Sequence, residues 1–139
     1  MAFLSDSEDE IYSEVLQHNH RILLQVELVD SVRPPHRISL DGLRGYSVPA
    51  GSRRVQFRIL LPSAGLTDSR AREARGFVDV ELVAGHHYHV AGNYAGSVRT
   101  FYLLDQTTNQ SASPAIDLGF FGPVPLNNQY IPIIIPIKI

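Results

Sequence analysis

Apolar and polar residues alternate with a period of two along much of this chain, and this pattern constrains the fold more than any other feature. Successive side chains of a β-strand point to opposite faces, so an alternating run has one face suited to burial. The clearest apolar positions are Ile22, Leu24, Val26 and Leu28 in one run, and Val55, Phe57, Ile59 and Leu61 in another. Both runs are predicted to be strands that bury one face.

Further strand-like runs at 76–83, 86–94, 98–105 and 130–139 are separated by turn signals. These signals include Pro34-Pro35, Asp41-Gly42 and Pro49-Ala50-Gly51. We expect Asp41-Gly42 to close a turn after which residues 46–48 return as the partner strand. Seven or eight short strands indicate an all-β fold, a β-sandwich of the immunoglobulin or transthyretin kind, with a closed barrel as the alternative.

Residues 5–19 carry the helical signal of the sequence. Ser5 and Glu8 fit a capping box, and acids at 6, 8, 9 and 10 suit the first turn of a helix. An apolar stripe at helical spacing follows, formed by Ile11, Tyr12, Val15 and Leu16. The predicted organisation is therefore a short N-terminal helical segment at 1–20 and a β-sandwich domain at 21–139.

Composition excludes several classes of function. A chain of 139 residues is the size of one domain, and without cysteine it forms no disulfide and no thiolate metal site. A net charge of −2 offers no electrostatic basis for binding nucleic acid. No run approaches the ~20 apolar residues that span a bilayer, and the acidic N-terminus lacks the pattern of a signal peptide.

Residues 77–91 predict a β-hairpin around a three-residue loop at 83–85, in which Gly85 adopts a positive φ. Pairing of residue 82 with residue 86 then puts one apolar set on one face: Val78, Val80, Leu82, Tyr88 and Val90. The opposite face holds four possible zinc ligands: Asp79, Glu81, His87 and His89. Either this face binds Zn²⁺, or its acids and histidines complement each other across the strands with no cofactor.

No Gly-x-Ser-x-Gly, His-Glu-x-x-His, phosphate-loop or dinucleotide motif occurs in the sequence, and we expect a protein that is not an enzyme. A polar loop is predicted at 62–75. It contains Arg70, Arg72 and Arg75, which either hold an anionic partner or only keep the loop soluble.

Four segments resemble the PEGA-like and related small β-sandwich domains of bacterial envelopes. They are Ile38-Ser-Leu-Asp41-Gly42, Val48-Pro-Ala-Gly51 leading into Arg54-Val-Gln-Phe57, Val83-Ala-Gly85-His-His-Tyr88, and Tyr102-Leu-Leu-Asp105. The Pro-Glu-Gly-Ala motif itself is absent. The resemblance implies a non-enzymatic accessory module in an envelope or extracellular assembly.

The C-terminal segment, Tyr130-Ile-Pro-Ile-Ile-Ile-Pro-Ile-Lys-Ile139, predicts an edge strand. Its odd positions share one face, which carries Ile131, Ile133, Ile135, Ile137 and Ile139. Both prolines have the other parity, so one edge lacks N–H groups while the opposite edge can pair. The isoleucine row must be covered, either by the same subunit or by a neighbouring one.

These features together predict a structural or protein-interaction module of a larger assembly, such as an envelope complex, a filament or a phage particle. Its expected partners are other proteins or further copies of the chain, with no nucleic acid and no membrane span. The alternative is a β-sandwich that binds a metal or a small ligand on the face of His87 and His89.

Overall fold

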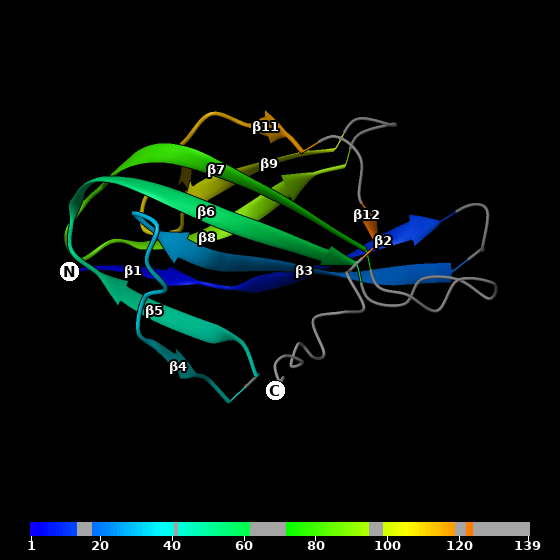
Figure 1. The fold of residues 1–139 in the computed structure, drawn as a ribbon, viewed down its shortest axis with the longest axis horizontal. Coiled ribbons are helices and arrows are strands. Elements are labelled where there is room, and N and C mark those ends of the chain that lie inside the picture. Colours follow the sequence, from blue (N-terminus) through cyan, green and yellow to red (C-terminus); the bar gives the residue numbers. More distant parts are fainter. Residues whose placement is uncertain (14–17, 41, 62–71, 95–98, 119–121, 124–139) are drawn as a thin grey trace, which may run out of the picture.

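The chain forms two β-sheets (Figure 1). The structure, a computed structural model, describes residues 1–13, 18–40, 42–61, 72–94, 99–118 and 122–123, and of residues 11–20 and 122–123 the backbone alone. Within these residues there are twelve strands and no helix. The predicted all-β class is confirmed, and the two sheets are consistent with a β-sandwich.

The first sheet has seven strands in the order β10-β9-β8-β1-β5-β4, with β11 also paired to β9. Its strands are β1 (Ala2–Ser5), β4 (His36–Ile38), β5 (Arg44–Val48), β8 (His87–Asn93), β9 (Thr100–Asp105), β10 (Gln110–Ser111) and β11 (Ile116–Asp117). All pairs are antiparallel except β1 with β8, which run parallel.

The second sheet has five antiparallel strands in the order β12-β7-β6-β3-β2. They are β2 (Ser7–Ser13), β3 (His18–Val29), β6 (Gly51–Leu61), β7 (Arg72–Leu82) and β12 (Gly122–Pro123). The chain passes from the first sheet to the second at Asp6, the residue between β1 and β2.

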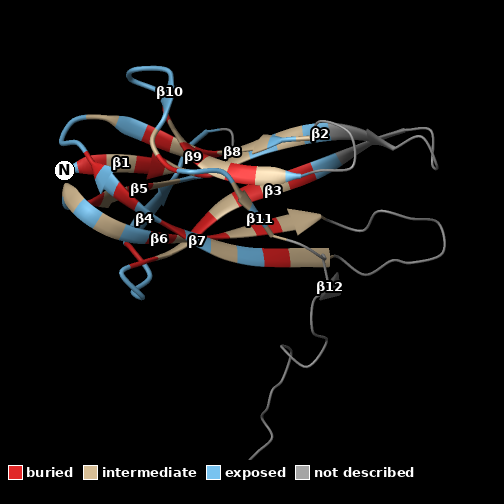
Figure 2. Cartoon of the chain, turned by 90° about the horizontal axis from the view of Figure 1, so that it is seen from above, coloured by how far each residue is buried: buried red, intermediate tan, exposed pale blue. Residues whose placement is uncertain are grey.

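One apolar core lies between the inner faces of the two sheets, and buried positions alternate with more exposed ones along the strands (Figure 2). The first sheet contributes Ala2, Leu4, Tyr46, Val48, Tyr88, Val90, Phe101 and Leu103. The second contributes Ile22, Leu24, Val26, Val29, Val55, Phe57, Ile59, Val78, Val80 and Leu82. The inner faces predicted from the period of two are confirmed at Ile22, Leu24, Val26, Val55, Phe57, Ile59, Val78, Val80, Leu82, Tyr88 and Val90.

A β-bulge in β3 changes the predicted face at one end of that strand. Val26 pairs with Phe57 and Leu28 with Gln56, which leaves Glu27 as an extra residue. An extra residue reverses the facing of those after it. Consequently Val29 is buried in the core, and Leu28, predicted to be a core residue, is only half-buried.

The predicted N-terminal helix at 5–19 is wrong for the described residues. β2 pairs with β3 from Ser7↔Leu24 to Ser13↔His18, so long-range pairing outweighs the local helical signal. Two of the acids placed in a first helical turn instead have partners elsewhere in the fold, on β3 and directly after β8. Glu8 forms an ion pair with Arg21 at 2.6 Å, and Asp9 accepts a hydrogen bond from the Tyr94 hydroxyl at 2.9 Å.

The structure confirms one predicted turn and corrects another. The turn at Gly42 (φ +84°) joins β4 and β5, which pair from His36↔Tyr46 to Ile38↔Arg44. The predicted hairpin of 77–91 is wrong, because β7 pairs with β6 in the second sheet while β8 pairs with β1 and β9 in the first. Residues 83–86 therefore connect the two sheets. The apolar residues of β7 and β8 share one parity because both strands contribute to the same core.

Gly85 provides the first test of the fold. Its φ of +82° places it in the left-handed region, where a β-branched residue is strained even though a Cβ there would meet no other atom. Gly85→Val should lower the free energy of unfolding by at least ~1 kcal/mol, measured by urea denaturation. Gly85→Asn is the control and should cost less, because asparagine tolerates this region. Equal losses for both variants would contradict a backbone origin of the effect.

Candidate functional site

The four residues predicted to bind zinc lie on two different sheets. Asp79 forms an ion pair with Arg54 at 2.8 Å, and Glu81 accepts a hydrogen bond from Ser52 Oγ at 2.7 Å. On the first sheet the ring of His87 stacks on Phe3 at 4.9 Å. Glu81 does not face His87 across a ladder, nor does Asp79 face His89, because the predicted register does not form. Among the described side chains no group of three or more His, Asp or Glu residues could hold a metal ion.

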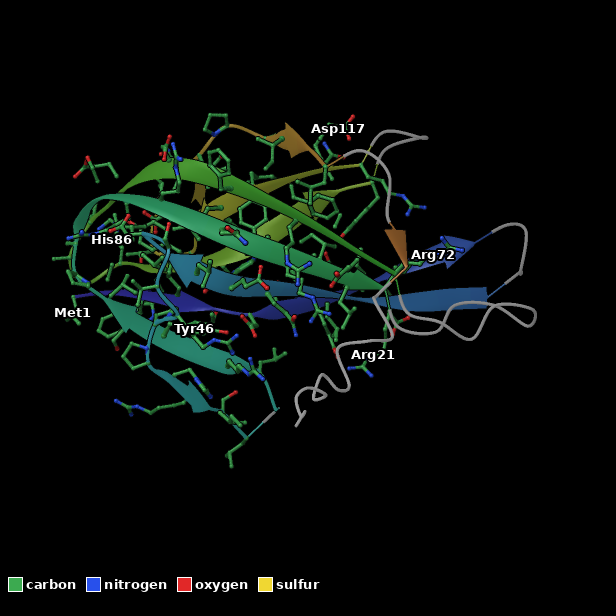
Figure 3. The ribbon with its side chains drawn as sticks, in the orientation of Figure 1. Met1, Arg21, Tyr46, Arg72, His86 and Asp117 are labelled. Atoms are coloured by element: carbon green, nitrogen blue, oxygen red, sulfur yellow. The ribbon has the colours of Figure 1, made fainter. Side chains whose placement is uncertain are left out.

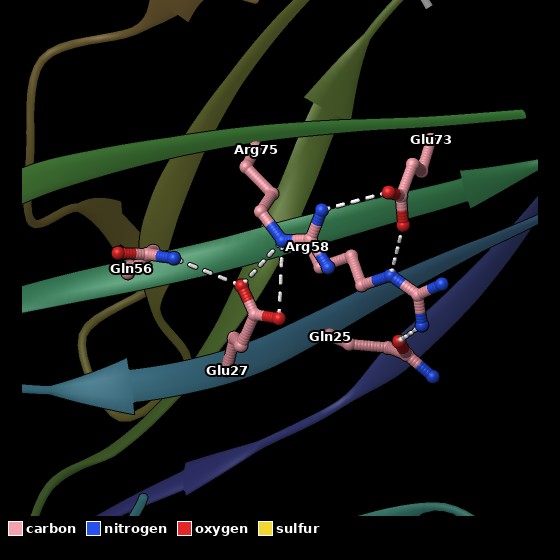
Figure 4. A network of polar contacts seen from close by, with 6 residues as sticks. All are labelled: Gln25, Glu27, Gln56, Arg58, Glu73 and Arg75. Carbon is pink, nitrogen blue, oxygen red and sulfur yellow. Dashed lines mark hydrogen bonds and ion pairs between the residues drawn. The ribbon is translucent and has the colours of Figure 1, made fainter. Parts of the chain in front are cut away.

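Arg75, predicted to lie in a partner-binding loop, belongs to an ion-pair network on the outer face of the second sheet (Figure 4). Its Nε donates to Glu27 at 2.9 Å and its Nη1 to Glu73 at 2.7 Å. Arg58 Nε donates to the same Glu73 at 2.7 Å, and Gln56 donates to Glu27 at 2.9 Å. Arg72 begins β7, and Arg70 lies outside the described residues.

The network holds both of its acids in the ionised form. Burial alone would raise the pKa of Glu27, but hydrogen bonds from Arg75 and Gln56 outweigh it and lower that pKa. The pKa of Glu73 is lowered in the same way, against burial, by Arg58 and Arg75. Two acids on neighbouring strands thus share one arginine, and the network links β3, β6 and β7 side by side.

A buried carboxylate joins the two sheets where the chain passes between them. Asp6 is 6% exposed, and its Oδ1 accepts hydrogen bonds from the Val26 N–H and from the Tyr46 hydroxyl, both at 2.9 Å. Tyr46 lies on β5 of the first sheet (Figure 3), and Val26 lies on β3 of the second. β2 pairs with β3 only as far as Leu24, and the Asp6 side chain takes the Val26 N–H two residues further on.

Burial has the largest effect on the pKa of Asp6. Burial raises its pKa above 3.8, although the Val26 and Tyr46 hydrogen bonds and the nearby charges of Arg44 and His36 act in the opposite direction. The pKa of Tyr46 is also raised, because burial and the Asp6 carboxylate disfavour the phenolate. Tyr46 is therefore a stable donor to Asp6 at neutral pH.

The inner face of the first sheet extends beyond the cover of the second sheet at β4. His36 pairs with Tyr46 and Ile38 with Arg44, so directly opposite residues lie on the same face. Tyr46 is 5% exposed, whereas Ile38 is 66% exposed. Leu40, two residues after Ile38, is fully exposed. We call this surface, formed by Ile38 on the outermost strand of the sheet and by Leu40 in the turn after it, the β4 edge.

In the sequence Ile38 and Leu40 lead into the turn signal Asp41-Gly42, but no pattern indicates that the second sheet stops short of them. Asp6 was also missed as a junction residue. The sequence did contain a signal for its burial, because position 6 continues the alternation of the buried residues Ala2 and Leu4. The predicted partner-binding residues of the C-terminal segment, Ile131, Ile133, Ile135, Ile137 and Ile139, lie outside the described residues.

No protein-family model matches this chain, and no curated protein or solved structure shows significant similarity to it. The PEGA-like resemblance stays a prediction. The part of the chain that the structure describes holds no helix that is long and apolar enough to cross a membrane.

The ion-pair network predicts a loss of stability when Glu73 is neutralised. Glu73→Gln removes the charge shared by Arg58 and Arg75, and its side chain is only 11% exposed, so the variant should lose about 1–3 kcal/mol of unfolding free energy. Glu8→Gln, which breaks the exposed pair with Arg21, should change it by less than about 0.5 kcal/mol. Urea denaturation at neutral pH measures both. Similar values for the two variants would contradict a role for the network.

Substitution of Asp6 should change both the stability of the fold and the dependence of that stability on pH. Asp6→Ala leaves the buried Val26 N–H and Tyr46 hydroxyl without this acceptor and should cost roughly 2–3 kcal/mol, while Asp6→Asn keeps an acceptor oxygen and should cost less. Because the pKa of Asp6 is raised by folding, the folded state binds this proton more tightly. The wild type should therefore lose stability relative to Asp6→Asn as pH rises from below 3.8 through the raised pKa. Denaturation across the acidic range checks the sign, and a relative gain with rising pH would overturn it.

Proposed function

We propose that this chain is a non-catalytic protein-interaction module that assembles by strand addition at the β4 edge. The observation that carries the proposal is the uncovered inner face at Ile38 and Leu40. In the described residues β4 pairs on one side with β5, and no strand pairs with its other side. An open backbone edge beside exposed apolar side chains is a suitable template for an added strand.

The C-terminal segment has the complementary character. The spacing of its prolines leaves one edge able to pair, and its isoleucine row requires an apolar surface. Ile38 lies on the inner face of β4, and Leu40 follows it in the turn to β5, so a strand added beside β4 would bring isoleucines onto Ile38, next to Leu40. We propose residues 130–139 of a neighbouring copy as the added strand.

An assembly of this kind fits the expected place of the module in an envelope complex, a filament or a phage particle. When each copy donates a segment to the next, the contact is heterologous, and it produces rings or filaments according to the rotation between subunits. The structural observations favour an interaction surface over the alternative of a zinc site, since the four predicted ligands are divided between the two sheets.

Light-scattering mass measured at several protein concentrations tests this proposal. Ile38→Lys with Leu40→Lys should abolish self-association and leave the melting temperature nearly unchanged, because both side chains are largely exposed. Val83→Lys is the matched control, since Val83 is an exposed apolar residue away from β4, and it should associate like the wild type.

Deletion of residues 130–139 identifies the donor. A soluble, folded monomer that no longer associates supports donation to a neighbour. An unfolded or insoluble product means that the segment covers its own subunit and is not available to another copy. Association that survives both the deletion and the two lysines would refute the proposal.

A further inference from the structure

A small pocket lies beside the Asp6 junction, where β2 separates from β3. Beyond Leu24, where the pairing with β2 ends, the segment that holds Arg33, Pro34 and His36 lies next to residues 25–27 of β3. That segment is fixed by a tight turn in which Val29 and Val32 exchange backbone hydrogen bonds of 2.8 and 3.0 Å. The pocket has a volume of about 80 Å³. A water molecule needs roughly 10–15 Å³ of such space, so the pocket has room for a cluster of waters or one small anion.

Three arginines from different parts of the chain line this pocket. Arg33 comes from the segment before β4, Arg44 from β5 and Arg58 from β6. The imidazole of His36 also lines it, next to the ring of Tyr46 at 6.3 Å between centroids. These cationic groups converge from both sheets although their positions in the sequence are far apart.

The acids nearby are already engaged. Glu27, the acid of the pocket lining, is bonded to Arg75 and Gln56. Arg58 uses its Nε for Glu73, which it shares with Arg75.

The positive charge left over belongs to Arg33 and Arg44. Among the described residues neither forms an ion pair with a carboxylate. Arg44 lies close enough to Asp6 to affect it electrostatically, but Asp6 Oδ1 accepts its hydrogen bonds from Val26 and Tyr46. The pocket therefore has an excess of positive charge.

We propose that this pocket binds a phosphate group. Guanidinium groups match phosphate oxygens in bidentate geometry, and a phosphate dianion brings two negative charges to Arg33 and Arg44 where a monocarboxylate brings one. The small volume admits the phosphate group itself, and a larger molecule carrying it would extend into solvent. This site does not depend on strand addition at the β4 edge, so either proposal can fail without the other.

Isothermal titration with inorganic phosphate at constant ionic strength tests the site. The wild type should bind, and Arg33→Gln with Arg44→Gln should weaken binding at least about tenfold, because each removes a charge-assisted hydrogen-bond donor. Arg33→Gln alone should weaken it as well, and because Arg33 is exposed this variant keeps the test valid if the double variant does not fold. Phosphate should also raise the melting temperature of the wild type.

Arg37→Gln is the matched control, since Arg37 is an exposed arginine of β4 outside the pocket lining, and its affinity for phosphate should equal that of the wild type. Acetate at the same ionic strength should bind far more weakly than phosphate. Equal affinity for acetate would assign the pocket to carboxylates and overturn the proposal. No detectable binding of phosphate, or equal losses in Arg33→Gln and Arg37→Gln, would overturn it too.

Discussion

The buried carboxylate of Asp6 is the contact on which the arrangement of the two sheets depends. It is the first residue at which the chain passes from one sheet to the other, and it binds a backbone N–H of one sheet and a tyrosine hydroxyl of the other. Burying a carboxylate is unfavourable unless its oxygens are hydrogen-bonded, and here two donors satisfy one oxygen. Because Asp6 takes over the Val26 N–H, β2 can leave β3 at this point. The open edge of β3, and the pocket beside it, follow from that departure.

The two sheets use their surfaces differently. On the outer face of the second sheet the charged groups are paired with one another across three strands: Glu27, Arg58, Glu73 and Arg75. Because these groups are already paired with one another, they have little left with which to bind a partner. The inner, apolar face of the first sheet instead extends beyond the end of the core, and Ile38 is exposed there. An apolar face at an open edge favours association, so contacts with other chains are expected at β4 and not over the charged network.

The sequence predicted the faces of the strands well and their partners poorly. A period of two is a local property, and it identified the inner faces of β3, β6, β7 and β8 apart from the shift at the Glu27 bulge. Pairing is not local, because any two strands with compatible faces satisfy the same pattern. Residues 78–90 therefore looked like one hairpin, although β7 and β8 lie in different sheets that share one core. The helical signal at 5–19 failed for the same reason: β3 supplies a partner that no local pattern reveals. The candidate site could not be predicted, since Arg33, Arg44 and Arg58 converge only when both sheets are in place.

His36 belongs to both of the surfaces proposed here. It lies on β4, where its side chain lines the pocket, and it shares its strand and its face with Ile38. β4 is only three residues long and pairs with one described strand, so it has few contacts that hold it in place. A phosphate held by Arg33 and Arg44 would lie next to this strand at His36, and an added strand would pair along its open edge. Both proposed ligands would therefore contact the same short strand, and any coupling between the two sites would be reciprocal.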